Sequence, residues 1–367
     1  MNAANPIDHA LEPVLMPTLA VIADLLHAQR HLHPSVLMRV VEAVGDHAVP
    51  VKAVQDALAN IETPGDLAPY LEPVNVALGL CAKAIAALQE TPDTPDGVFS
   101  AYRALRYTPY ALEALYPLSK SSELVSRFFL EDAEDDAALE RIHAVAGSRS
   151  EHGISHVDNE RGTKGGYSVY VPEFLEPGGT HPVVFALHGG SGHGRSFLWT
   201  WLKEARSRGF ILVSPTSVGD TWALMEGDVD SANLDRMLEQ VDGQWSVDSN
   251  HLLMTGMSDG GTFTYMSGLR GASPFSHLAP ISASFHPMMM EIVEAPNIKK
   301  RPIYLTHGVH DWMFNVDVAR LAHQVLSSLG AYVVYREIGD LAHTYPREEN
   351  THILNWFLDG TAPPEAA

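Results

Sequence analysis

One serine of the chain stands in a setting that makes its hydroxyl a candidate nucleophile. Residues 256–260 read Gly-Met-Ser-Asp-Gly, which places Ser258 between two glycines. The apolar run at 251–254 predicts a buried strand just before this motif, and residues 262–269 predict a helix just after it. A Gly-x-Ser-x-Gly turn between a strand and a helix holds its serine in a strained conformation, with the hydroxyl exposed above the sheet. The motif is common by chance, so the prediction depends on this strand–turn–helix context.

A serine hydroxyl is a weak nucleophile until a neighbouring base removes its proton, and the chain offers a base and a partner for that base. Asp311 follows the apolar strand predicted at 302–306, and His343 follows the strand predicted at 332–338. The chain order serine, acid, histidine is the order found where the serine lies on a Gly-x-Ser-x-Gly turn of this kind. We therefore predict Ser258 as nucleophile, His343 as general base and Asp311 as the acid that orients the histidine.

Other residues near these positions are expected to have structural roles. The chain has 19 histidines, so position rather than residue type singles out the base. We expect His307 and His310 to support the loop that carries the acid. Asp317 is the rival acid, and we expect it to cap the helix that follows.

A glycine-rich stretch follows another predicted strand. Residues 188–192 read His-Gly-Gly-Ser-Gly and come directly after the apolar run 183–187. Glycines at such a turn let backbone N–H groups point at the oxyanion that forms when a nucleophile attacks a carbonyl. We predict the N–H groups of Gly190 and Asp259 as the two donors, with Ser191 as the alternative to Gly190. A plain glycine-rich turn is the competing interpretation, whereas neither of the usual phosphate-loop patterns follows a strand here.

The elements that must position these residues belong to the second part of the chain. Strands and helices alternate from about residue 147, and the strands are predicted at 167–171, 183–187, 210–213, 251–254, 302–306 and 332–335. Short apolar strands that alternate with helices predict a mostly parallel sheet covered by helices on both faces. Ligands of such sheets bind at the carboxyl ends of the strands, where the candidate residues fall.

The first part of the chain has a different pattern. Apolar residues recur there at helical spacing without any strand pattern, and Pro34, Pro50 and Pro73 each open an apolar segment. We therefore predict an all-helical domain at 1–146 and a catalytic domain at 147–367.

Composition excludes several classes of partner. The formal net charge of −21 argues against nucleic acid and against anionic membrane surfaces. The single cysteine, Cys81, has no partner for an intramolecular disulfide, which is typical of a reducing compartment. We see neither a signal-peptide pattern nor an apolar stretch that approaches the ~20 residues needed to span a bilayer. We therefore expect a cytoplasmic protein without membrane contact, and the histidine spacings lead us to expect no metal site.

From about residue 150 onward the sequence resembles the polyhydroxybutyrate depolymerase-like and feruloyl-esterase-like carboxylesterases of the α/β-hydrolase superfamily. The segments that carry the resemblance are 166–172, 182–190, 256–261, 307–311 and 342–346. The resemblance implies an α/β-hydrolase fold, the triad Ser258, Asp311 and His343, and cofactor-free hydrolysis of carboxylic esters. The chain departs from secreted members in lacking disulfide pairs and in having Leu-Ala rather than glycine before the histidine. These departures argue against extracellular polymer degradation and leave the triad intact.

The predicted substrate is a small or medium acyl or aryl ester. A thioesterase or peptidase with the same triad is the alternative, and a non-catalytic binding protein of the same fold is a further one. Aromatic and histidine side chains on the loops are candidates to line the substrate pocket, namely Trp222, Phe285, His286, Trp312 and Phe314. The N-terminal helices carry apolar faces, and we consider two roles for them, control of access to Ser258 and a homo-oligomer contact.

Overall fold

The chain forms two compact units in the computed structural model, Met1–Ala146 and Gly147–Ala367. Each unit is described by itself below. The structure describes residues 6–60, 67–94, 96–145, 152–176, 178–225, 227–291 and 295–363.

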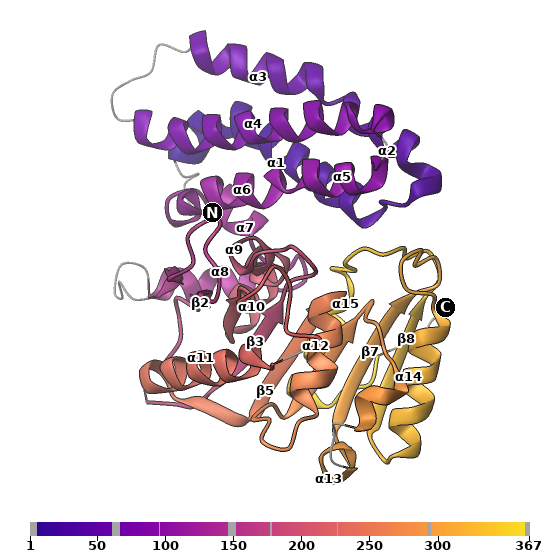
Figure 1. The fold of residues 1–367 in the computed structure, drawn as a ribbon. Helices are drawn as coiled ribbons and strands as arrows, with labels where there is room; N and C mark the ends of the chain where they lie inside the picture. Colours follow the sequence, from indigo (N-terminus) through magenta and orange to yellow (C-terminus); the bar gives the residue numbers. More distant parts are fainter. Residues whose placement is uncertain are drawn as a thin grey trace. The chain divides into compact units, whose positions relative to one another are not determined.

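The N-terminal unit is helical throughout its described residues (Figure 1). The helix α4 packs against α1, α2, α3, α5 and α6, because its apolar residues are spread around much of its circumference. Its buried side chains include Val74, Leu78, Cys81, Ile85 and Leu88. The helices are α1 (Pro6–Arg30), α2 (Leu37–Gly45), α3 (Ala48–Asn60), α4 (Ala68–Gln89), α5 (Gly97–Leu105), α6 (Tyr107–Leu115), α7 (Glu123–Phe128) and α8 (Asp135–Ala144).

The three prolines predicted to open helices behave differently. Pro34 begins a short 3-10 turn before α2, and Pro50 lies in the first turn of α3, as expected. Pro73 lies inside α4 instead, and the proline of the first turn is Pro69. The prediction for Pro73 is therefore wrong. A proline inside a helix removes one backbone hydrogen bond, and the apolar packing of α4 offsets that cost.

Two helices of this unit change the sequence-based view of membrane contact. By length and composition, α1 and α4 are long and apolar enough to cross a bilayer. The expectation that no segment passes this test is therefore wrong. Core helices of globular proteins pass it as well, and 44% of the apolar window of each helix is buried within the structure.

The second unit is built on one eight-stranded sheet (Figure 1). The strand order is β1-β2-β4-β3-β5-β6-β7-β8, in which β1 and β2 run antiparallel to their neighbours and the remaining pairs are parallel. The strands are β1 (Gly153–Val157), β2 (Tyr167–Val171), β3 (His181–Leu187), β4 (Ile211–Pro215), β5 (Val247–Met257), β6 (His277–Ile281), β7 (Pro302–Gly308) and β8 (Tyr332–Ile338).

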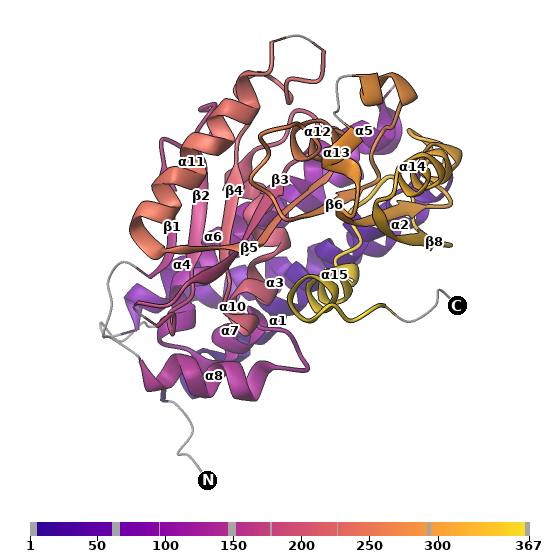
Figure 2. The same cartoon turned by 90° about the horizontal axis from the view of Figure 1, so that it is seen from below.

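Helices cover both faces of this sheet, and Figure 2 shows α11, α12 and α14 on one side of it and α10 and α15 on the other. Alternate residues of β3, such as Phe185, join the core formed with the first group of helices. On the other face, the rings of Tyr304 in β7 and Trp356 in α15 lie 5.4 Å apart. The helices are α9 (Gly194–Phe197), α10 (Leu202–Arg208), α11 (Val229–Trp245), α12 (Asp259–Gly268), α13 (Ala295–Ile298), α14 (Asp317–Ser328) and α15 (Glu349–Asp359).

The strand order, with an antiparallel start followed by parallel strands and helices on both faces, is that of the α/β-hydrolase fold. The predicted fold class is thereby confirmed. The sequence analysis missed two strands, β1 and β6. In β6 the reason is Pro280, because a proline lacks the N–H that a central strand normally donates to its neighbour.

Candidate active site

Ser258 lies at the sharp turn between β5 and α12. Its backbone has φ 56° and ψ −120°, a region that residues with side chains rarely adopt. The two flanking glycines make the turn possible. A Cβ on Gly256 would lie 2.5 Å from the backbone of Gly260, and a Cβ on Gly260 would lie 2.5 Å from the carbonyl oxygen of His188. The local geometry is therefore that of a nucleophile elbow.

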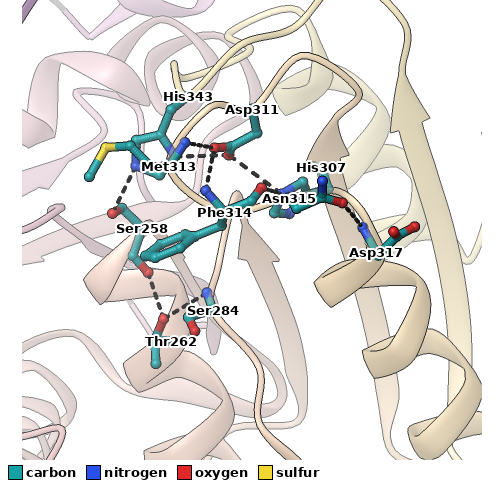
Figure 3. Close-up of polar contacts among 10 residues, drawn as sticks. All are labelled: Ser258, Thr262, Ser284, His307, Asp311, Met313, Phe314, Asn315, Asp317 and His343. Atoms are coloured by element: carbon teal, nitrogen blue, oxygen red, sulfur yellow. Dashed lines mark hydrogen bonds and ion pairs between the residues drawn. The ribbon is translucent and has the colours of Figure 1, made fainter.

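His343 connects the serine with a carboxylate (Figure 3). Its Nε2 lies 3.0 Å from Ser258 Oγ, and its Nδ1 lies 2.8 Å from Asp311 Oδ2. Because a carboxylate oxygen accepts, Nδ1 carries the proton and Nε2 is left as the acceptor for the serine hydroxyl. All three side chains are almost completely buried. The structure thus brings together the three residues that the sequence analysis selected, in the hydrogen-bonded order that general-base activation requires.

The loop after β7 holds the carboxylate in place. Asp311 Oδ1 accepts hydrogen bonds from the backbone N–H groups of Met313, at 2.9 Å, and of Phe314, at 2.8 Å. The other oxygen, Oδ2, is thereby directed at His343 (Figure 3). The rings of Phe314 and His343 also form a T-shaped contact, with centroids 5.3 Å apart. Backbone donors on one oxygen and the imidazole on the other fix both the carboxylate and the histidine.

The rival acid, Asp317, lies away from this arrangement. Its carboxylate forms an ion pair with Arg320 at 2.9 Å on the exposed surface of α14. It is the first residue of that helix rather than its cap, and its own backbone N–H donates to the side chain of Asn315. The expected capping role is therefore wrong, since Asn315 supplies the side-chain oxygen two residues earlier.

The two histidines near the acid have different positions. His307, at the end of β7, is completely buried and lies beside Asp311. His310 is exposed, and it contributes its backbone N–H, which donates to the carbonyl oxygen of Leu341. That hydrogen bond ties the acid loop to the loop that carries His343.

The glycine-rich turn after β3 packs against the elbow. A Cβ on Gly189 would lie 3.6 Å from Ser258 Cβ, and one on Gly190 would lie 2.7 Å from the carboxylate of Asp259. The Ser191 N–H is already used, because it donates to the carbonyl oxygen of Asp220 at 3.2 Å. Among the described residues no acceptor pairs with the N–H of Gly190. The N–H of Asp259 belongs to the first turn of α12, whose donors have no partner within the helix.

A buried histidine supports this turn. Nδ1 of His188 lies 2.7 Å from the carbonyl oxygen of Gly189, and its Nε2 accepts from the backbone N–H of Ser217. Both ring nitrogens are satisfied only in the neutral form with the proton on Nδ1. Burial lowers the pKa of His188 to about 4, so the ring keeps this form at neutral pH.

The loop after β4 completes the support, and sequence reasoning missed the residue that holds it. Both oxygens of the buried Asp230 accept backbone hydrogen bonds at 2.8 Å, from Val218 and from Ala223. Burial raises the pKa of this carboxyl, while the two N–H donors oppose that rise. The same loop donates a 2.5 Å hydrogen bond from Thr221 Oγ1 to Asp259.

The five residues proposed to line a substrate pocket separate into two groups. Trp222 is 2% exposed, and its indole N–H donates to the carbonyl oxygen of His188. Trp222 therefore supports the glycine-rich turn after β3. Phe285 is 4% exposed and packs on Tyr265 in the core. These two positions belong to the core, in contrast to the predicted lining role. His286 is exposed, and Trp312 and Phe314 are half-buried on their loops.

Within the described ranges, the structure contains no group of three or more histidine, cysteine, aspartate or glutamate side chains arranged to hold a metal ion.

Comparisons with known proteins point to esterases. No family model matches the sequence. The chain is 30% identical over 160 residues to feruloyl esterase C of Emericella nidulans, a stretch that covers 41% of this chain and 56% of that protein. It is 27% identical over 166 residues to a bifunctional acetylxylan esterase/xylanase of Neocallimastix patriciarum, covering 44% and 24% respectively. The chain therefore spans between a quarter and just over half the length of these relatives.

Among solved structures, a thermostable esterase aligns with a TM-score of 0.46 and 18% identity, over 56% of this chain and 62% of that chain. The sequence relatives confirm the resemblance to feruloyl-esterase-like proteins that the motifs predicted.

Proposed function

We propose that this chain hydrolyses carboxylic esters through an acyl-enzyme, with Ser258 as nucleophile, His343 as general base and Asp311 as the orienting acid. The observation that carries the proposal is the continuous pair of hydrogen bonds from Ser258 Oγ to His343 at 3.0 Å and from His343 to Asp311 at 2.8 Å. Sequence similarity to two curated esterases supports the same reaction.

Acylation begins when Ser258 Oγ attacks the ester carbonyl and its proton passes to His343 Nε2. The imidazolium that forms is stabilised by Asp311 Oδ2, which already accepts the Nδ1 proton. The carbonyl oxygen becomes an oxyanion, and the N–H groups of Gly190 and Asp259 donate to it. Each such donor is worth about 2.7–4 kcal/mol of transition-state stabilisation in other enzymes.

The tetrahedral intermediate then collapses, and His343 gives its proton to the departing alkoxide. A water molecule takes the place of the alcohol, and the same base activates it against the acyl-enzyme. The carboxylic acid leaves and Ser258 regains its proton. No step needs a metal or an organic cofactor.

The substrate is a small or medium acyl or aryl ester. The strongly acidic chain favours neutral or cationic substrates over anionic ones through its long-range field. The half-buried ring of Phe314 lies on the loop of the acid and contacts the ring of His343, so it offers apolar surface beside the general base.

A substrate panel tests the reaction class. Incubation with p-nitrophenyl acetate, butyrate and benzoate should release nitrophenol, faster than matched thioesters and anilides are cleaved. A fluorophosphonate probe should label the protein at Ser258, and EDTA should leave the rate unchanged. Preferential cleavage of the thioester or the anilide would reassign the reaction, and absence of both turnover and labelling would indicate a non-catalytic binding protein.

The identity of the acid can be tested by amide substitution. In Asp311→Asn the backbone donors hold the amide oxygen at the Oδ1 position, so the NH2 group faces His343 Nδ1. The imidazole must then carry its proton on Nε2, where it can no longer accept from Ser258. We expect kcat to fall by about 10²- to 10⁴-fold, less than on removal of the serine or the histidine.

The matched control is Asp317→Asn, which removes the charge of the rival acid on the same loop–helix junction. Its kcat should stay within about twofold of the wild type, because the carboxylate of Asp317 forms an ion pair with the exposed Arg320 and is not hydrogen-bonded to His343. A larger loss in Asp317→Asn than in Asp311→Asn would contradict the assignment.

A further inference from the structure

His307 lies beside the proposed acid, Asp311, and the mechanism described above does not use it. It lies at the carboxyl end of β7 and is completely buried. Its Nε2 lies 2.8 Å from the carbonyl oxygen of Phe314 and 3.4 Å from Asp311 Oδ2, the same oxygen that faces His343 (Figure 3). The ring therefore spans both ends of the turn that presents the carboxylate.

The protonation state of His307 follows from these contacts. A carbonyl oxygen can only accept, so Nε2 carries a proton and its N–H dipole also faces Asp311. Nδ1 is buried and has no hydrogen-bond partner among the described residues. The ionisable groups that face the ring are Asp311, His343 and Glu337, its register partner on β8. Burial lowers the pKa of His307 despite the two carboxylates, and a second proton on Nδ1 would have no acceptor.

We propose that His307 is a positioning residue, which acts through its neutral Nε2–H form on the acid of the triad. The N–H donates to Phe314 and so closes the turn 311–314, whose backbone donors hold Asp311 Oδ1. The same N–H dipole faces Asp311 Oδ2 and weakens the electrostatic attraction between the carboxylate and His343. This inference rests on the proposed esterase function and adds a fourth residue to its machinery.

The role requires a donor at the Nε2 position rather than a ring. His307→Gln can place an amide N–H near the position of Nε2, whereas His307→Phe keeps the ring shape and removes the donor. His307→Asn carries an amide too short to reach Phe314. His310→Gln, on the exposed histidine of the same loop, is the matched control.

The measurement is kcat, KM and the pH profile of kcat/KM with p-nitrophenyl acetate, normalised to the fraction of serine that a fluorophosphonate titrates. We expect His307→Phe and His307→Asn to lower kcat by about 10- to 100-fold with little change in KM, because the acid is misplaced. The pH profile of kcat/KM should also differ from that of the wild type, because the position of Asp311 and the dipole that faces its Oδ2 change together. His307→Gln should recover most of the rate, and His310→Gln should match the wild type.

The wild-type data distinguish failure of the proposed function from failure of the proposed role of His307. If the wild type neither turns over the ester nor reacts with the probe, the proposed function fails and the role of His307 with it. If the wild type is active and the Phe or Asn variant keeps its kcat and pH profile, only the role of His307 is overturned. Equal losses in the Gln and Phe variants, with unmoved profiles, would show that the ring serves packing alone.

Discussion

Replacement of Ser258 by alanine is expected to abolish ester turnover, with a fall in kcat of about four to six orders of magnitude. The substitution removes one oxygen atom, the nucleophile itself, which His343 contacts at 3.0 Å. Alanine carries the same Cβ into the strained backbone of the elbow, so the fold should be retained. Initial rates on p-nitrophenyl acetate, together with thermal unfolding of both proteins, provide the measurement.

A neighbouring serine gives the control. Ser284 contributes its backbone N–H to the side chain of Thr262, and this contact survives truncation of the Ser284 side chain (Figure 3). Ser284→Ala should therefore keep its activity and its reaction with a fluorophosphonate, whereas Ser258→Ala should lose both. Retention of more than a few per cent of activity in Ser258→Ala would rule out this serine as the nucleophile.

Replacement of His343 by alanine is expected to be nearly as damaging, again by about four to six orders of magnitude in kcat. Without the imidazole, no described residue that hydrogen-bonds to Ser258 Oγ can take its proton during attack. The variant should also react slowly with a fluorophosphonate, because that reaction needs the same activated hydroxyl. Single-turnover rates of labelling and steady-state ester hydrolysis measure the two effects separately.

The double variant Ser258→Ala/His343→Ala tests whether the two residues act as one unit. Its residual rate should equal that of either single variant, because a base without its nucleophile contributes nothing further. The control is His352→Ala, a half-buried histidine of α15, which should remain active. If the fold-loss in kcat of the double variant equalled the product of the two single losses, Ser258 and His343 would act independently.

The candidate site was predictable because its residues follow strands. Runs such as 183–187 are apolar without interruption, as burial on both sheet faces requires, so their ends could be located. Each proposed residue then lies within a few positions of a strand end, and the parallel sheet brings those ends to one edge. The hydrogen bonds of His343 are consistent with that reasoning, since no other part of the described chain supplies a histidine to Ser258.

The supports of the site were much less predictable. Asp230 lies in the first turn of α11, where an acidic residue ordinarily needs no explanation beyond the helix dipole. Only the folded chain shows that its carboxylate faces the preceding loop. Trp222 was assigned to a pocket because it lies on a loop, but the indole N–H finds the carbonyl oxygen of His188. Such long-range pairings depend on how loops pack, which local patterns do not encode.

The separation of the site residues along the chain has a consequence for how the protein becomes active. Ser258 and His343 are 85 residues apart in sequence, and Asp311 and His343 are 32 apart. The parallel pairing of β7 with β8 requires the crossover through α14 between them, and non-local contacts of this kind are slow to form. The shortest contiguous segment that holds all three residues runs from 258 to 343. A chain in which β8 has not yet joined the sheet therefore has its nucleophile without its base. We therefore expect ester hydrolysis to recover during refolding only once β8 has paired with β7.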